Sequence, residues 1–318
     1  MDFFTHLVFG ALIYILFLKD FGFSYIFLAV LFSVLPDLDI FIIPLKRIIK
    51  SNYLEHRGGS HSYIIGIMIS GIGGILYSLI TQQSFINAWF ISMAFYSLHV
   101  SMDLLTTTKI PYLYPLSKQE KSFYVEKAGS LFTMIISVSF LVLLGFLYNF
   151  SADLSLLNLF INVYTSFFFL YYLYRIISKV WISSNLENNQ KYFPGILPFY
   201  YTIYNHDIIG NQFSLGIEKR SHFSNTKGIE IFNNVLDAKE FSLFKKGTKL
   251  CKADYYYAKW TLFPTFTRNQ DTFSIRYFFL ETMMRSRTMY IQFIFRKSTQ
   301  ELISFNRGSG RIQQSIIN

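Results

Sequence analysis

The side chains of this chain that could do chemistry are histidines and aspartates near the ends of apolar segments within the first 103 residues. Imidazole and carboxylate groups ligate zinc, manganese and iron. An aspartate near the centre of a membrane-spanning helix costs about 2.5–3.5 kcal/mol, so such a group normally has a partner or a function. A cation bound between several of these groups would offset that cost. The candidates are His6, Asp37, Asp39, His56, His61, His99 and Asp103.

Two pairs of candidates have informative spacing. His99 and Asp103 are four residues apart, so on a helix they share one face and could meet one ion. Asp37 and Asp39 follow a proline, and on an extended backbone their carboxylates would face the same way. These carboxylates would repel each other unless they were protonated or bridged by a cation. A solvated helix end is the alternative interpretation of the aspartate pair.

The segment His56-Arg57-Gly58-Gly59-Ser60-His61-Ser62 contains the highest density of candidate groups. Its two glycines allow the backbone to approach a ligand closely. Arg57 has the bidentate geometry that suits a phosphate or carboxylate, with contact to an anionic lipid as the alternative. We expect His61 to be a metal ligand and His56 to be a ligand or a general base.

The segments that must position these groups are apolar enough to cross a membrane. The 318 residues are 52% hydrophobic and 15% charged, whereas soluble domains carry about 25% charged residues. A span needs roughly 17–25 mostly apolar residues. Glycines in the third of the predicted spans indicate close helix packing. Six segments approach the required length: 3–18, 23–43, 63–80, 85–105, 130–150 and 156–182.

The distribution of lysine and arginine predicts the orientation of these segments. The connections on the opposite side contain only Lys19. The positive-inside rule therefore places both termini in the cytoplasm and brings all seven candidates to one depth at the cytoplasmic side. The basic residues that decide this follow the second, fourth and sixth segments: Lys46, Arg47, Lys50 and Arg57; Lys109, Lys118, Lys121 and Lys127; Arg175 and Lys179.

The composition changes at about residue 183, where Asn, Lys, Ser and Gly become common and no later stretch could span a membrane. The predicted fold class is a mainly α membrane protein with about six transmembrane helices, followed by a small β-rich cytoplasmic domain. We place the transmembrane metal-site domain at 1–182 and the C-terminal domain at 183–318.

Within the C-terminal domain, alternating aromatic and β-branched residues at 273–278 and 288–295 predict strands. Asn233-Asn234 and Lys246-Gly247 are candidate turns. We expect residues 302–318 to be frayed.

The net charge of +10 does not by itself indicate a nucleic-acid partner. The basic residues lie between apolar segments and along the tail, which is typical of charges that set topology. The single cysteine, Cys251, excludes an intrachain disulfide and a CxxC metal site. We expect no cleavable signal peptide, because the first apolar stretch begins at once without a basic region before it.

Five short motifs follow one another along residues 1–130. They are Thr5-His6-(three residues)-Gly10, Leu35-Pro36-Asp37-Leu38-Asp39, the segment from His56 to Ser62, His99-(three residues)-Asp103-(two residues)-Thr106-Thr107, and Tyr114-Pro115-Leu116-Ser117. In this order they resemble the motifs of the YdjM-like membrane-bound metal-dependent hydrolases, also described as LexA-binding, inner-membrane-associated hydrolases. Two positions depart from the family pattern, Gly59 in the His-Arg-Gly motif and Lys109 after the threonines, and neither removes a candidate ligand.

The resemblance implies a hydrolase of the inner, or cytoplasmic, membrane. A metal such as zinc or manganese lowers the pKa of a bound water and polarises a phosphoryl or carbonyl oxygen. We therefore expect one or two ions that activate water against an ester, foremost a phosphoester of an amphipathic or lipid substrate. His56 and Arg57 would be catalytic, with Arg57 holding an anionic group. The expected metal ligands are His6, Asp37, Asp39, His61, His99 and Asp103.

A transporter, a haem protein and a scaffold are the alternatives. Intramembrane Asp and His also form ion pathways, but these candidates cluster at one face and the sequence shows no inverted repeat. Haem ligation by His6 and His99 would leave the aspartate pair unexplained. The basic C-terminal domain could bind a protein partner such as a DNA-associated regulator, whereas we expect no direct contact with nucleic acid.

Overall fold

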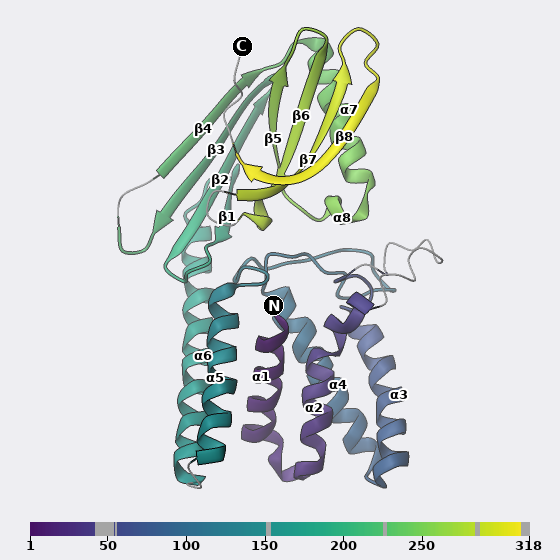
Figure 1. Cartoon of the computed structure of the whole chain (residues 1–318), viewed down its shortest axis with the longest axis vertical. Coiled ribbons are helices and arrows are strands. Elements are labelled where there is room, and N and C mark those ends of the chain that lie inside the picture. The colour runs from purple at the N-terminus through teal and green to yellow at the C-terminus, as the bar shows by residue number, and fades with distance from the viewer. Residues whose placement is uncertain (42–53, 55, 151–153, 225–227, 284–286, 313–318) are drawn as a thin grey trace. The chain divides into compact units, whose positions relative to one another are not determined.

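The protein has a helical unit, Met1–Lys179, followed by a β-rich unit, Val180–Asn318 (Figure 1). The computed structural model describes residues 1–41, 54, 56–150, 154–224, 228–283 and 287–312. Of the basic residues used to predict orientation, Lys46, Arg47 and Lys50 lie outside the described residues. The fold class expected from the sequence, a mainly helical membrane part followed by a small β-rich domain, is confirmed.

The helical unit consists of long apolar helices, and its longest described connection joins α4 to α5. The described helices long and apolar enough to cross a membrane are Phe3–Phe21, Phe23–Phe41, Tyr63–Thr81, Leu131–Phe150 and Leu154–Ser184. The predicted fourth span, 85–105, contains α4, which is as long but less apolar because it carries several polar residues, among them Asn87, His99 and Asp103. The elements are α1 (Phe3–Ile13), η1 (Tyr14–Leu18), η2 (Lys19–Phe21), η3 (Phe23–Tyr25), α2 (Ile26–Val34), η4 (Leu35–Phe41), α3 (Tyr63–Thr81), α4 (Phe85–Leu104), α5 (Leu131–Phe150) and α6 (Leu154–Ser184).

Individual residues determine where α3 starts and how closely α3 packs against α4. The Ser62 side chain caps the helix by accepting a hydrogen bond from the backbone N–H of Ile64. A Cβ atom on Gly74 would lie 3.0 Å from the backbone of Trp89 in α4. A larger residue at this position would therefore push the two helices apart, so the close packing predicted from the glycines is present here.

The β-rich unit contains two four-stranded antiparallel sheets, each with its strands in chain order (Figure 1). One sheet consists of β1 (Gln190–Pro194), β2 (Tyr200–Ile209), β3 (Gln212–Ser221) and β4 (Gly228–Val235). The other consists of β5 (Leu262–Arg268), β6 (Thr272–Phe279), β7 (Arg287–Arg296) and β8 (Leu302–Arg311). Between the sheets in sequence come α7 (Ala238–Ala253) and α8 (Tyr255–Ala258), and η7 (Leu280–Thr282) follows β6.

The core of this unit is largely aromatic. Residues from β3, β6 and α7, including Phe213, Phe273 and Cys251, are buried in one cluster. β6 and β7 pair in a register that places Phe273 opposite Phe295 and Ile275 opposite Phe293. The two strands predicted from alternating residues at 273–278 and 288–295 therefore lie within β6 and β7 and are confirmed.

Three local predictions for this unit are wrong. Asn233-Asn234 lies inside β4, where the backbone pairs with β3. Lys246-Gly247 lies inside α7, where Gly247 makes room for the Tyr277 hydroxyl, which would be 3.0 Å from a Cβ atom. Residues 302–311, expected to be frayed, form β8 and pair with β7. In each case long-range pairing or packing overrides the local signal; residues 313–318 lie outside the described residues.

Candidate metal centre

The candidate groups lie at one end of the helical unit. The start of α1, the end of α2 with η4, the start of α3 and the end of α4 all lie at this end, whereas the α1–α2 and α3–α4 connections lie at the other (Figure 1). An up-and-down path through the helices thus brings together residues separated by up to 97 positions. The sequence predicts this convergence.

Four of the predicted ligands form one compact group. Asp37, His61, His99 and Asp103 each offer a ligand atom, and these atoms all lie within 4.8 Å of one another. His61 Nε2 lies 3.2 Å from Asp103 Oδ2, 3.5 Å from Asp37 Oδ1 and 3.2 Å from His99 Nε2. Ligand atoms held about 2.0–2.1 Å from a tetrahedral zinc ion are themselves about 3.3 Å apart. The spacing therefore fits one small divalent ion.

Two carboxylate oxygens in this group lack a hydrogen-bond partner. Asp37 Oδ1 and Asp103 Oδ2 are buried and have no hydrogen-bond partner in the part of the chain that the structure describes, although Arg57 Nε lies 3.2 Å from Asp103 Oδ2. Buried polar atoms nearly always have such a partner, and a buried carboxylate that is not fully hydrogen-bonded is costly. A cation placed among the four ligand atoms would satisfy both oxygens, so this donor set fits a metal.

Hydrogen bonds orient the two imidazole rings toward the centre of the group. His99 Nδ1 donates to the backbone carbonyl of Ser33 at 2.7 Å. His61 Nδ1 lies 3.1 Å from Ser60 Oγ and 3.4 Å from Asp39 Oδ2. With the proton of each neutral ring on Nδ1, the Nε2 lone pairs face each other. Metal-ligating histidines are oriented in this way by partners of the other ring nitrogen.

Asp39 lies beside the four-atom group and holds the segment that carries both neighbouring histidines. Its Oδ2 accepts hydrogen bonds from the backbone N–H of Arg57 at 3.0 Å and from the hydroxyl of Ser60 at 2.5 Å. Its Oδ1 lies 2.6 Å from His56 Nδ1. The His56 side chain is 41% exposed, and its ring centre lies 5.9 Å from that of His61. Asp39 and His56 therefore form a dyad at the edge of the site.

His6, near the start of α1, also lies next to the four-atom group. Its ring stacks on His99 with 3.7 Å between the ring centres. His6 Nε2 lies 3.3 Å from Asp103 Oδ1, which also contacts the amino group of Met1. The two oxygens of Asp103 therefore face different neighbours, with Oδ2 directed to the four-atom group and Oδ1 to His6 and Met1.

Arg57 is buried next to the same carboxylate. Its Nε lies 3.2 Å from Asp103 Oδ2, and its terminal nitrogens donate to Thr108 Oγ1 at 2.9 Å and to the Met1 carbonyl at 2.6 Å. Burial lowers the pKa of Arg57 from its usual value, and the nearby carboxylates, Asp37 foremost, oppose that shift. The guanidinium thus connects the His56–Ser62 segment to the ends of α1 and α4.

A family model describes the part of the chain that carries this site. The YdjM inner membrane protein family matches residues 1–182. The chain belongs to this family. Searches of curated proteins and of solved structures found no match. The YdjM match covers every candidate ligand and ends within α6, so the two sheets lie outside it. The resemblance seen in the sequence is confirmed, and the protein is a membrane protein.

Sequence reasoning missed two contributors to this YdjM-family site. Ser33 acts through its backbone carbonyl, which has no sequence signal. Met1 contacts Asp103, Arg57 and the Tyr172 hydroxyl, yet methionine is not a residue type that indicates a site. The hydroxyl of Ser60, in the same segment as His56 and His61, also donates to Asp39.

Proposed function

We propose that this protein is a membrane-embedded, metal-dependent hydrolase that cleaves an ester, foremost a phosphoester of an amphipathic or lipid substrate. The observation that carries the proposal is the convergence of two imidazole nitrogens with two buried carboxylate oxygens that have no hydrogen-bond partner among the described residues. When bound there, a divalent ion such as zinc or manganese lowers the pKa of a water molecule and polarises a phosphoryl oxygen.

In this proposal some of the residues are ligands of the ion and others orient those ligands. Asp37, His61, His99 and Asp103 supply the ligand atoms of one ion. Asp39 and His6, also predicted as ligands, support this set in the proposal: Asp39 orients His61, and His6 stacks on His99. Partners of this kind fix ring orientation and raise the basicity of the ligating nitrogen.

His56 is the residue that we assign to proton transfer. Asp39 accepts from its Nδ1, which leaves Nε2 of the half-exposed ring as the proton acceptor. A carboxylate bonded to the first ring nitrogen stabilises the imidazolium that forms when the second takes a proton. His56 would take a proton from the attacking water and return it to the leaving alcohol.

Arg57 contributes positive charge to the same region. Its guanidinium lies 3.2 Å from Asp103 and partly balances the carboxylates of the site. We propose that this charge favours an anionic substrate group near the metal, because opposite charges attract strongly where water is scarce.

The proposed location is the inner, cytoplasmic membrane, with several spans and both termini in the cytoplasm. The described connection between α4 and α5 carries Lys109, Lys118, Lys121 and Lys127 at the end of the unit where the site lies. The described connections at the other end carry only Lys19. A site at the cytoplasmic boundary could act on the head group of a membrane-resident substrate.

The test is metal analysis of the detergent-purified protein, followed by hydrolysis assays. The assay panel consists of alkyl phosphates, phospholipids and carboxylic esters, each with and without a chelator. We expect about one bound ion per chain and an activity that is lost on chelation and restored by zinc or manganese. Activity that survives complete removal of the metal would contradict the proposal. Replacement of Asp20, an exposed aspartate in η2 at the other end of the first candidate span, is the control for nonspecific effects.

A further inference from the structure

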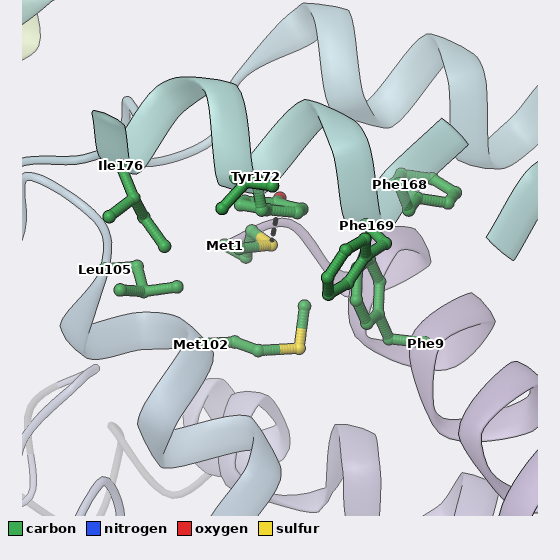
Figure 2. A pocket seen from close by; sticks show the side chains of 9 residues that line it. Met1, Phe9, Met102, Leu105, Phe168, Phe169, Tyr172 and Ile176 are labelled. Carbon is green, nitrogen blue, oxygen red and sulfur yellow. Dashed lines mark hydrogen bonds between the residues drawn. The ribbon is translucent and has the colours of Figure 1, made fainter. Parts of the chain in front are cut away.

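An apolar cavity of about 230 Å³ lies between α1, α4 and α6 (Figure 2). Figure 2 shows the side chains of α6 along one wall and those of α4 along the opposite one. At about 30 Å³ for a group the size of a water molecule, the cavity has room for roughly eight such groups. Its lining residues are Met1, Phe9, Met102, Leu105, Phe168, Phe169, Tyr172, Leu173 and Ile176.

The chemistry of the lining favours hydrocarbon over water. The side chains are aliphatic, aromatic or thioether groups. The hydroxyl of Tyr172 is directed to Met1 Sδ, 2.9 Å away, as the dashed line in Figure 2 shows. A buried water needs two to four polar partners, so a cavity of this kind is better filled by methylene groups.

Three residues that line the cavity are close in sequence or hydrogen-bonded to residues of the candidate metal centre. Met102 in its wall directly precedes Asp103, and Phe9 is one helical turn from His6 on the same face of α1. Met1, also in the wall, contacts Asp103 through its amino group and accepts a hydrogen bond from Arg57 through its carbonyl. The cavity wall therefore shares Met1 with the surroundings of Asp103, and the turns of α1 and α4 that line it also carry His6 and Asp103.

The cavity is also bordered by side chains that face outward from the helical unit. On α6, Phe169 is 67% exposed, Leu173 is 41% exposed and Ile176 is 38% exposed. This helix is long and apolar enough to cross a membrane. In a bilayer these exposed side chains contact lipid chains, so hydrocarbon can reach the cavity without passing through water.

We propose that this cavity binds one hydrocarbon chain of the substrate, while the esterified head group of the same molecule lies at the metal centre. The inference rests on the proposed hydrolase function and specifies its substrate as an amphipathic phosphoester with at least one alkyl chain. The chain enters from the bilayer along α6 and displaces no ordered polar contact, because the lining offers almost none.

Binding is tested without turnover by photolabelling. The probe is a single-chain alkyl phosphate with a diazirine in the middle of its chain, added to the metal-loaded protein in detergent. We expect labelled peptides to contain residues of the cavity wall, such as Met102 and Phe168. An excess of unmodified alkyl phosphate should reduce the labelling at least tenfold, whereas the same excess of alkane without a head group should not.

Two variants and one control link this labelling to the cavity. Leu105→Trp and Leu173→Trp fill it from opposite walls, and we expect each to reduce labelling at least fivefold. Leu170→Trp is the control, because Leu170 is exposed on α6 and does not line the cavity. The bound metal is measured in every variant. Unchanged metal content shows that the helical unit is folded and that the ligand set is intact.

The possible results separate this inference from the proposed function. Two results together support both the inference and the proposed function. The first is labelling at the cavity that unmodified alkyl phosphate reduces by competition. The second is a KM that rises in Leu173→Trp for long-chain esters and stays unchanged for short-chain esters. If the protein hydrolyses no ester, the proposed function fails, and the competition result still decides whether an amphipathic phosphate binds in the cavity. Labelling that is spread evenly over exposed residues, or competed equally by plain alkane, overturns the inference.

Discussion

Two buried carboxylates of the β-rich unit differ from those at the candidate metal centre in the helical unit. In the β-rich unit, Arg268 donates to both oxygens of Glu240, at 2.8 and 2.9 Å. Both oxygens of Glu281 accept from the backbone N–H of Thr261, at 2.9 and 2.8 Å. In the helical unit, one oxygen each of Asp37 and Asp103 is buried with no hydrogen-bond partner among the described residues.

This difference distinguishes carboxylates that stabilise a fold from those available to a ligand. A fully hydrogen-bonded carboxylate has its charge compensated within the protein, and adding a cation would require breaking those bonds. A buried carboxylate oxygen without such a bond costs free energy until a cation compensates it. The candidate metal centre therefore carries a cost of the kind that functional sites carry, whereas Glu240 and Glu281 in the β-rich unit do not.

The largest expected effect is loss of the metal on changing Asp103, whose Oδ2 has no hydrogen-bond partner among the described residues. Asp103→Asn keeps the shape of the side chain and removes its charge, so we expect bound metal to fall to the background level, as measured by elemental analysis. Asp20→Asn, at an exposed position, should leave the metal content unchanged. Equal metal content in both variants would remove the distinction between the two kinds of carboxylate.

The closed interior of the β-rich unit should protect its thiol. Burial raises the pKa of Cys251 to about 12 from a usual value of 9.0. At pH 8 a shift upward of this size lowers the thiolate fraction roughly a thousandfold, and the thiolate is the reactive form. Alkylation followed by mass spectrometry should therefore be very slow and should accelerate as the pH rises toward 12. A thiol placed at the exposed position of Ser309, in a Cys251→Ser background, is the fast-reacting control.

The dyad at the edge of the metal centre should affect turnover and leave metal binding unchanged. His56→Ala removes the proposed proton acceptor, and we expect the rate of ester hydrolysis to fall about a hundredfold, the lower end of typical general-base contributions. Elemental analysis should show unchanged metal content, because His56 lies outside the four-atom group. Loss of metal in this variant would instead place His56 among the ligands.

The smallest effect is expected for a compensated carboxylate. Glu240→Ala leaves the Arg268 guanidinium and the backbone N–H of Asp237 without their partner, at a cost of about 1–3 kcal/mol. Hydrogen exchange measured by mass spectrometry should show faster opening of β-unit peptides, with metal content unchanged. Glu187→Ala, at an exposed position, should change stability by less than about 0.5 kcal/mol. Loss of metal in Glu240→Ala would show that the two units do not behave separately.

Much of the site was predictable because its signals are local. Polar residues in long apolar segments stand out, and their positions at alternating helix ends predict that they meet at one end of the unit. The sequence did not distinguish Asp37, in the four-atom group, from Asp39, which holds His56 and Ser60. That distinction depends on the direction of side chains in the η4 segment, which residue spacing on an assumed extended backbone does not give.

The β-rich unit shows where local signals fail. Gly247 looks like a turn residue in the sequence but lies in a helix, because the space it leaves is filled by the Tyr277 hydroxyl. Residues 302–311 look like a frayed tail but form β8, because their backbone groups pair with β7. Each outcome depends on a partner elsewhere in the chain. For Gly247 the partner is Tyr277, 30 positions away, and for β8 it is the neighbouring strand β7.

The sequence alone determined that this is a membrane protein of the helical kind, with histidine and aspartate side chains that could ligate a metal at the ends of its apolar segments, because hydropathy and residue type are properties of the chain itself. The tertiary structure decided which four side chains share one point, which carboxylate supports them and where an apolar cavity adjoins them. These features arise from the relative positions of α1, α2, α4 and α6. The distances between these helices cannot be derived from the sequence of any one segment.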